Sequence, residues 1–178
     1  MGLGKTVQGI ATLEILHAYP AVIVCPPNLT LNWESEYSRW LPHRSTAVVT
    51  NRREFPMDYE VVIVGYSNVS TWVRQLSRHA GYIFDESHYA KTKTSQRTKA
   101  CKKMARSSPT APILMLTGTP ITNRPMEYAA QLAITGQISM EIIAALAALF
   151  GRERVLPERE IKRQSDALIA ELDSYPGV

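Results

Sequence analysis

The chain of 178 residues has 45% hydrophobic and 20% charged residues and a formal net charge of +4. This composition is typical of a soluble globular domain that can bury a core, and its mild positive charge permits a nucleic-acid partner without requiring one. The apolar runs are too short to span a membrane, and no signal peptide precedes the first motif. Cys25 and Cys101 stand in no metal-binding spacing. We therefore expect an intracellular protein, of the cytoplasm, nucleoid or nucleus, with reduced thiols.

Residues 1–6, Met-Gly-Leu-Gly-Lys-Thr, supply the second half of a phosphate-binding loop, G-x-x-x-x-G-K-[ST]. In such a loop the backbone N–H groups surround the phosphates, the Lys ammonium neutralises their charge, and the Thr hydroxyl reaches Mg²⁺. Glycines are needed where a side chain would block the approach of the phosphates. A helical pattern follows at Val7, Ile10, Leu13 and Leu16, so we expect the loop to open a helix whose N-terminal dipole faces the phosphates.

Short apolar runs then alternate with helical patterns along the chain. Strands are predicted at residues 21–25, 46–50, 59–64, 81–84 and 112–116. Helices are predicted at residues 28–40, at 69–76 with Ser67 as the N-cap, at 94–106, and from the first turn at Pro125 to about 134. This alternation predicts an α/β fold with a mostly parallel sheet and helices on both faces. In such sheets the ligand site lies at the carboxyl ends of the strands.

An acidic cluster, Asp85-Glu86-Ser87-His88, follows one of these strands. An Asp–Glu pair at this place suits nucleotide hydrolysis, in which Asp85 holds Mg²⁺ while Glu86 orients and deprotonates the attacking water. The alternative is that both carboxylates only cap the next helix. His88 has an alternative role as a packing or hydrogen-bonding residue. A third polar cluster, Thr117-Gly118-Thr119-Pro120, follows the last strand, and it could be only a strand-to-helix turn.

Taken together, these motifs resemble one family. Met-Gly-Leu-Gly-Lys-Thr, Asp-Glu-Ser-His and Leu-Thr-Gly-Thr-Pro occur in the same order as in the Swi/Snf-type ATPases of helicase superfamily two. These are translocases on double-stranded DNA and are related to the DEAD/DEAH-box enzymes. The segment from Cys25-Pro26-Pro27 to Asn32-Trp33 is similar to the family's segment Ia, and Val64-Gly65-Tyr66-Ser67 is similar to its Ib region.

The resemblance covers residues 1–137 and implies a RecA-like P-loop NTPase lobe with ATP and Mg²⁺ as cofactors. By position, Gly2, Gly4 and Lys5 hold the phosphates, Thr6 and Asp85 serve Mg²⁺, and Glu86 acts on the hydrolytic water, with Lys5 and Asp85 as its catalytic partners. The same resemblance gives His88, Thr117 and Thr119 a role in coupling nucleotide state to DNA contacts and lobe movement. The segments that track the DNA backbone in the family contain Pro27, Asn32, Tyr66 and Ser67.

A basic stretch without acidic residues contains Lys91, Lys93, Arg97, Lys99, Lys102, Lys103 and Arg106. These cations could neutralise phosphates of a nucleic acid, above all Lys99, Lys102 and Lys103, or they could form a solvated helix face. Reading of base sequence is not expected from such a pattern, which favours backbone contacts. We expect Trp33 and Trp40 to be core residues rather than base-stacking ones.

The family pattern is incomplete at both ends. The strand that feeds the phosphate loop and the adenine-reading segment are expected ahead of residue 1, so that the lobe lacks its first strand. Residues 138–178 are expected to form a helical junction or the start of a connection to an absent second RecA-like lobe.

These observations indicate the first lobe of a DNA-dependent ATPase that hydrolyses Mg-ATP and, in the intact enzyme, moves along duplex DNA. As an isolated chain it is expected to turn over poorly, because the arginine fingers of the family lie in the second lobe. Two alternatives stay open. One is a catalytically inactive fragment that only binds nucleic acid or a partner. The other is part of a strand-separating helicase of the DEAH type.

Overall fold

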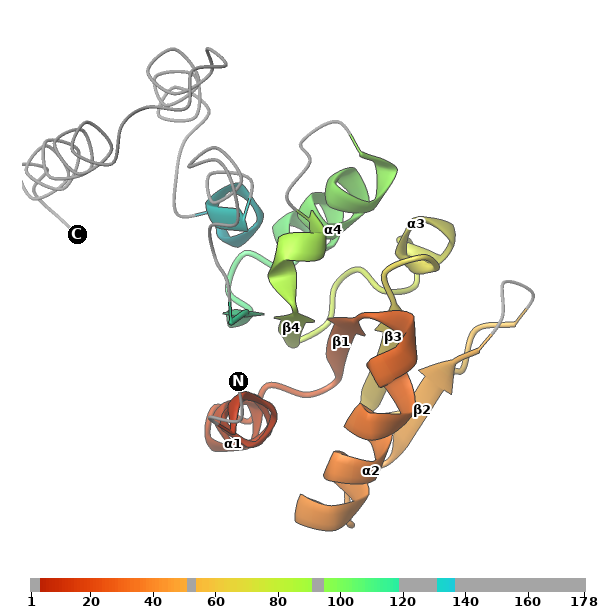
Figure 1. Ribbon diagram of the computed structural model, residues 1–178, viewed down its shortest axis with the longest axis vertical. Coiled ribbons are helices and arrows are strands. Elements are labelled where there is room, and N and C mark those ends of the chain that lie inside the picture. Colours follow the sequence, from red (N-terminus) through yellow and green to blue (C-terminus); the bar gives the residue numbers. More distant parts are fainter. Residues whose placement is uncertain (1–3, 51–53, 91–94, 119–130, 137–178) are drawn as a thin grey trace, which may run out of the picture.

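Five parallel strands form one sheet in the computed structural model, which describes residues 4–50, 54–90, 95–118 and 131–136. The strands lie in the order β2-β3-β1-β4-β5 (Figure 1). Their bounds are Ala21–Cys25 for β1, Thr46–Val49 for β2, Val61–Gly65 for β3, Gly81–Asp85 for β4 and Ile113–Leu116 for β5. Every neighbouring pair is parallel, which confirms the predicted α/β class.

The helices follow the predicted order. They are α1 (Lys5–Ile15), a 3₁₀ turn η1 (Pro27–Leu29) leading into α2 (Thr30–Trp40), α3 (Val69–Trp72), a 3₁₀ turn η2 (Ser87–Ala90) and α4 (Gln96–Arg106). Residues 131–135 are also helical. None of the helices in these described ranges is long and apolar enough to cross a membrane.

The prediction of Ser67 as a helix N-cap is wrong. Helix α3 begins at Val69 and its N-cap position is Asn68, whose side chain makes no capping hydrogen bond. The N–H of Asn68 instead bonds to the carbonyl of Gly65 at the end of β3. The chain therefore turns directly out of the strand, and this turn leads into the helix.

Helices cover both faces of the sheet, as predicted (Figure 1). Alternate strand residues point to opposite sides, so Ile23 and Ile63 pack with α1 and α2, whereas Val24 and Val64 pack with α3 and α4. Both cysteines are buried and free, and burial raises the pKa of each thiol to about 12.

The two tryptophans of α2 differ in their surroundings. Trp33 is completely buried, and the prediction of a core residue is confirmed. Trp40 is 52% exposed, so the same prediction is wrong for it. It lies in the last turn of the helix, where its indole N–H donates to Glu36 of the same helix at 2.9 Å instead of entering the core.

Helix α1 lies very close to strand β4. A Cβ atom at Gly9 would lie 3.0 Å from Cδ1 of Ile83, and one at Gly81 would lie 2.7 Å from Cδ2 of Leu13 and 2.8 Å from the carbonyl oxygen of Ala18. The absence of side chains at these two glycines therefore lets the helix and the strand pack at this distance. This contact sets where the start of α1 lies relative to the end of β4.

The other end of α1 is held by Arg44. Its guanidinium forms ion pairs with Glu14 at 3.0 Å and Glu60 at 2.6 Å, and it lies over the ring of Tyr19 at 4.2 Å. The hydrogen bond from Arg44 lowers the pKa of Glu14, and hydrogen bonds from the Ser45 backbone and then from Arg44 lower the pKa of Glu60. Arg44 thus links the end of α1 to the chain entering β3.

We predict that Gly81→Ala destabilises the protein by about 1–3 kcal/mol more than Gly65→Ala, because the new methyl group would overlap a backbone carbonyl. At Gly65 the nearest atom is Cγ of Pro27, 3.3 Å from the added Cβ, and a small shift can relieve that contact. Both changes restrict the unfolded chain equally. Urea unfolding of both variants measures the difference, and equal midpoints would contradict the close packing of α1 on β4.

We predict that Arg44→Met removes part of the acid sensitivity of folding. Glutamates with a lowered pKa stabilise the folded state above their ordinary pKa of about 4.3, and this contribution is lost as the pH falls through the lower folded value. The wild type should therefore lose more stability than Arg44→Met below about pH 4.3, by about 0.2–1 kcal/mol for each ion pair. Arg39→Met, an exposed charge loss on α2, is the control. Parallel curves of unfolding free energy against pH for all three proteins would contradict the prediction.

Candidate functional site

The start of α1 meets the end of β5 at the carboxyl edge of the sheet. Gly4 precedes α1 with φ of +67°, a left-handed conformation that glycine adopts without steric cost. Nζ of Lys5 lies 3.6 Å from the point that a Cβ atom of Gly118 would occupy. The folded chain therefore brings the predicted phosphate loop next to the Thr117-Gly118 segment, more than one hundred residues away in sequence.

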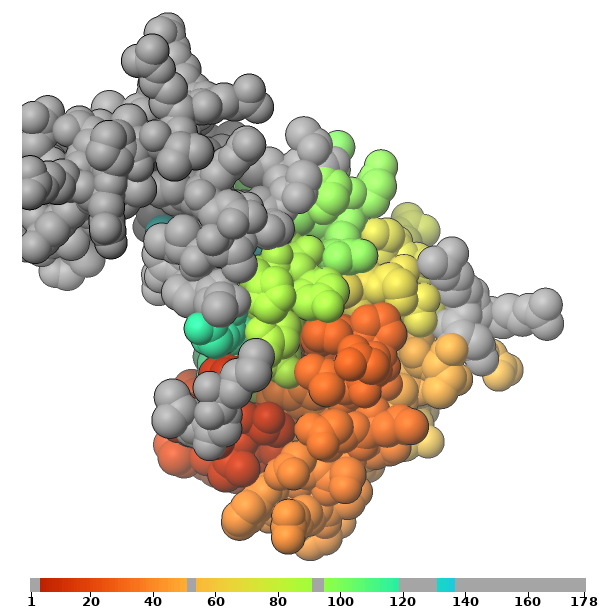
Figure 2. All heavy atoms as spheres, viewed as in Figure 1, coloured from red at the N-terminus to blue at the C-terminus, as the bar shows by residue number. Residues whose placement is uncertain are grey.

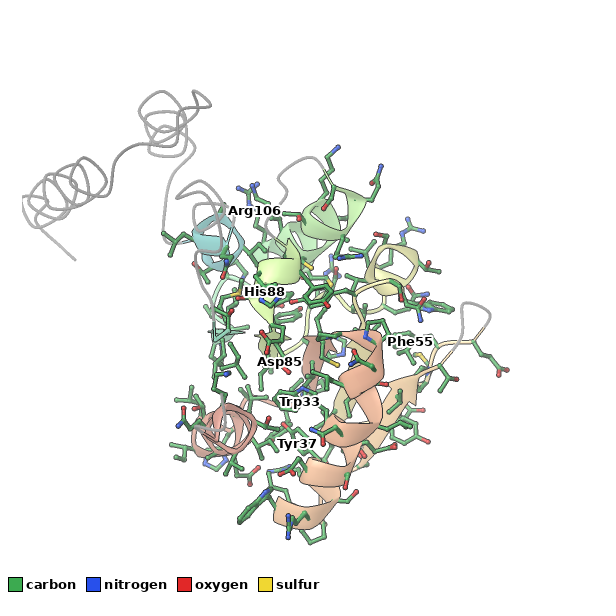
Figure 3. All side chains as sticks on the ribbon, viewed as in Figure 1. Trp33, Tyr37, Phe55, Asp85, His88 and Arg106 are labelled. Carbon is green, nitrogen blue, oxygen red and sulfur yellow. The ribbon has the colours of Figure 1, made fainter. Side chains whose placement is uncertain are left out.

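Asp85 lies at the end of β4 and is 7% exposed. Its Oδ2 accepts a hydrogen bond from Nε1 of Trp33 at 2.9 Å, and its Oδ1 accepts one from the backbone N–H of Glu86 at 2.9 Å. In Figure 3 its label stands between those of Trp33 and His88. The bond from the N–H of Glu86 lies just ahead of η2 and resembles a helix cap. The bond from Trp33 has no part in capping, so capping does not account for both bonds of this carboxylate.

Tyr66 forms a hydrogen bond to the backbone of Asp85. Its hydroxyl donates to the carbonyl oxygen of Asp85 at 3.0 Å, and burial raises the pKa of this hydroxyl well above its usual range. The side chain is only 1% exposed, because its ring stacks under Tyr89 with centroids 5.7 Å apart. The ring of Tyr66 is therefore buried, whereas the neighbouring Ser67 is exposed. The assignment of this segment to DNA contacts stays a prediction.

Glu86, His88 and Thr117 form a connected group. Nδ1 of His88 lies 3.3 Å from Oε2 of Glu86 and 3.4 Å from Oγ1 of Thr117. Glu86 has φ of +46°, an uncommon conformation for a residue with a side chain, and such conformations cluster at functional sites. The arrangement joins the ends of β4 and β5 through one imidazole, so the predicted coupling residues His88 and Thr117 do contact one another.

A pocket of about 300 Å³ opens beside this group. Its lining comes from three segments: Glu86, His88 and Tyr89 after β4, Gly118 after β5, and Pro26, Asn28 and Leu29 after β1. On the face shown in Figure 2 the segment after β4 lies beside the beginning of α2. Pro27 and Asn32, in the segment predicted to track DNA, are exposed.

The basic residues of α4 separate into two environments. Lys99, Lys103 and Arg106 are exposed, Lys102 is half-buried, and these four line a shallow hollow of about 490 Å³ with Ser107. Arg97 instead packs beside the rings of Tyr66 and Tyr89 and donates to the carbonyl oxygen of Tyr89 at 3.3 Å. The charged face of α4 is therefore formed by its later residues.

Two further contacts of the acidic cluster have no counterpart in the sequence analysis. One is the bond from Trp33 to Asp85, for which the only signal was the position of Trp33 in the segment similar to Ia. The other joins Ser87, which is completely buried, to Oε1 of Gln131 at 2.7 Å. The described residues do not include Gly2, Thr119, Lys91, Lys93, the predicted helix start at Pro125 or the segment 138–178.

The motifs and their geometry agree with a comparison to known families. A model described as the SNF2-related domain matches residues 1–173. The chain belongs to the SNF2-related domain family. The resemblance inferred from the sequence motifs is thereby confirmed.

Curated relatives match the chain over most of its length. A mouse protein named DNA annealing helicase and endonuclease ZRANB3 is 33% identical over 144 residues, covering 74% of this chain and 13% of that protein. A protein of Mycoplasma pneumoniae named uncharacterized ATP-dependent helicase is 34% identical over 139 residues, covering 70% of this chain and 13% of that protein. The chain thus spans a small part of the curated relatives it matches.

A solved SNF2 structure shares the fold. The structure titled Sulfolobus solfataricus SWI2/SNF2 ATPase core in complex with dsDNA superposes with a TM-score of 0.69 and 24% sequence identity. The match covers 83% of this chain and 32% of that one. The prediction of a RecA-like α/β lobe is confirmed by this likeness and by the parallel sheet.

The donor atoms of the site fit a magnesium–nucleotide complex. Within the described ranges no group of three or more His, Cys, Asp or Glu side chains is placed to hold a metal ion. Magnesium bound with a nucleotide needs fewer protein ligands, because phosphate oxygens and water complete its shell. The Asp85 carboxylate and the partly buried Thr6 hydroxyl are oxygen donors of the kind that magnesium prefers.

Proposed function

We propose that this chain is the ATP-binding lobe of a DNA-dependent ATPase, in which hydrolysis of Mg-ATP drives movement along duplex DNA when a second lobe is present. The observation that carries the proposal is that Lys5, Gly118 and the acidic cluster lie at the same edge of the sheet. The chain's membership of the SNF2-related domain family supports it. The relatives named as ATP-dependent helicases support ATP as the nucleotide.

Within this proposal the phosphates lie at the start of α1. Among the residues that the structure describes, none has an atom within 4 Å of a Cβ atom built at Gly4, apart from its chain neighbours, so these residues leave the space beside Gly4 open. The backbone N–H groups of the first turn point along the helix axis toward this space, and the helix dipole favours an anion there. Lys5 adds a positive charge, and Gly2, just ahead of these residues, completes the proposed phosphate contacts.

Thr6 and Asp85 would hold Mg²⁺, which neutralises charge on the phosphates when it is bound. Glu86 is the proposed base and positioning group for the attacking water; its side chain is 24% exposed and faces the pocket. His88 contacts both Glu86 and Thr117, so a shift of the segment after β5 would reach Glu86 through His88. We assign Thr117 and Thr119 to this coupling.

Duplex DNA is the proposed partner. The Sulfolobus structure with the same fold is a complex with dsDNA, and this supports a DNA-binding role for the lobe. Pro27, Asn32 and Ser67 are exposed and suit backbone contacts. The exposed cations of α4, with Lys102 beside them, provide a further phosphate-binding surface of the sequence-tolerant kind.

We predict that Lys5→Ala weakens binding of Mg-ATP by about 10- to 150-fold, because a charge-assisted interaction of about 1.5–3 kcal/mol is lost. Lys103→Ala, which removes an exposed lysine from α4, should leave the affinity unchanged. Glu86→Gln should keep the affinity and, with both lobes present, abolish DNA-stimulated phosphate release. Calorimetry and a phosphate-release assay measure the two quantities. Equal affinities of the wild type and Lys5→Ala would contradict the proposed function.

We predict that DNA binding is electrostatic and depends on α4. Each phosphate neutralised on duplex DNA contributes about −0.9 to the slope of log affinity against log salt. The combined change of Lys99, Lys102 and Lys103 to Ala should therefore flatten this slope by up to about 2.7. The matched single variants Lys103→Ala and Arg39→Ala test whether the DNA contacts lie on α4, because Arg39 is exposed on the α2 side of the sheet. A slope unchanged in the triple variant would show that the charged face of α4 is only solvated.

A further inference from the structure

Trp33 links the acidic cluster to helix α2 through a single buried hydrogen bond. Its indole N–H donates to Oδ2 of Asp85 at 2.9 Å. Trp33 is completely buried, and Asp85 is 7% exposed. The bond joins two residues separated by 52 positions in the sequence. In Figure 3 the labels of Trp33, Asp85 and His88 stand one above the other. Glu86, the residue after Asp85, lines the pocket together with His88.

The same indole also contacts the helix that begins at the phosphate loop. Its Cη2 atom lies 3.5 Å from the point that a Cβ atom of Gly9 would occupy, so the benzene edge of the ring packs against α1. One rigid side chain therefore touches α1 at one edge and Asp85 at the other. Trp33 sits on α2, next to the exposed Asn32.

The bond constrains how the carboxylate can bind a ligand. The Oδ1 atom of Asp85 is held by the N–H of Glu86, and Oδ2 is held by Trp33. Each carboxylate oxygen can accept more than one interaction, so both atoms keep capacity for a further ligand while their orientation is set. Groups that orient a metal ligand in this way contribute to metal affinity although they do not touch the metal.

We propose that Trp33 is a positioning residue of the nucleotide site, which fixes the Asp85 carboxylate in the orientation that binds the magnesium of Mg-nucleotide. This inference rests on the proposed function. A buried tryptophan that only fills the core would stabilise the fold and leave the dependence of nucleotide binding on magnesium unchanged. The two roles therefore differ in a measurable quantity.

The chain provides a matched control for this test. Trp40 lies on the same helix and donates the same kind of bond, from Nε1 to a carboxylate oxygen of Glu36 at 2.9 Å, but on the surface. Trp33→Phe and Trp40→Phe thus each remove one indole-to-carboxylate bond from α2. Affinity for ADP is measured for each variant of the 178-residue chain with magnesium and with a chelator.

We expect Trp33→Phe to reduce the gain in ADP affinity that magnesium provides by about 10-fold or more, in line with the loss of groups that orient metal ligands. The affinity without magnesium should change little. Trp40→Phe should retain the full gain. If Trp33→Phe does not fold, replacing Trp33 by benzothienylalanine puts sulfur in place of the indole N–H in a ring of nearly the same shape, and the same reduction is expected.

A second readout does not depend on affinity. The three tryptophans give three indole N–H signals in a ¹H–¹⁵N spectrum, which single Phe variants assign. Addition of Mg-ADP should shift the Trp33 signal more than addition of ADP with a chelator, whereas the Trp40 signal should respond equally to both.

An equal magnesium dependence of affinity in the wild type and the Trp33 variants, with a Trp33 signal that does not respond to magnesium, would overturn the positioning role alone. A wild type without magnesium-dependent ADP binding would overturn the proposed function and this inference with it.

Discussion

The carboxylate of Asp85 is buried, and a buried charge is tolerated only where hydrogen-bond donors surround it. Its donors are the indole of Trp33 and the backbone N–H of Glu86, while the hydroxyl of Tyr66 holds the carbonyl of the same residue. Helix α2, the end of β3 and the turn after β4 are therefore tied to one residue. These bonds set the orientation of the Asp85 carboxylate in the proposed magnesium site.

The position of α1 is the second requirement of the proposed site, and packing along the whole helix decides it. Gly9 and Gly81 allow close contact with β4, and Arg44 holds the opposite end through Glu14. A helix moves as a nearly rigid element, so these contacts also place its first turn. Lys5 consequently lies beside Gly118, so the proposed phosphate loop meets the segment after β5 at the sheet edge.

The sequence predicted most elements because apolar runs of four or five residues between turn signals match buried parallel strands. It failed where local and tertiary effects disagree. Trp40 has the spacing of a core residue, yet it lies in the last turn of α2 and stays exposed. Ser67 has a capping side chain, but the turn out of β3 begins α3 without it.

The sequence by itself determined the order of strands and helices, the family, and the three polar clusters at strand ends, because these features depend on local spacing and residue type. Only the tertiary structure decided which distant residues meet. The bond from Trp33 to Asp85, the contact of His88 with Glu86 and Thr117, and the approach of Lys5 to Gly118 all arise from how helices pack on a parallel sheet. Such contacts leave no periodic pattern in one sequence, because each joins residues that are far apart along the chain or depends on a backbone turn that packing stabilises.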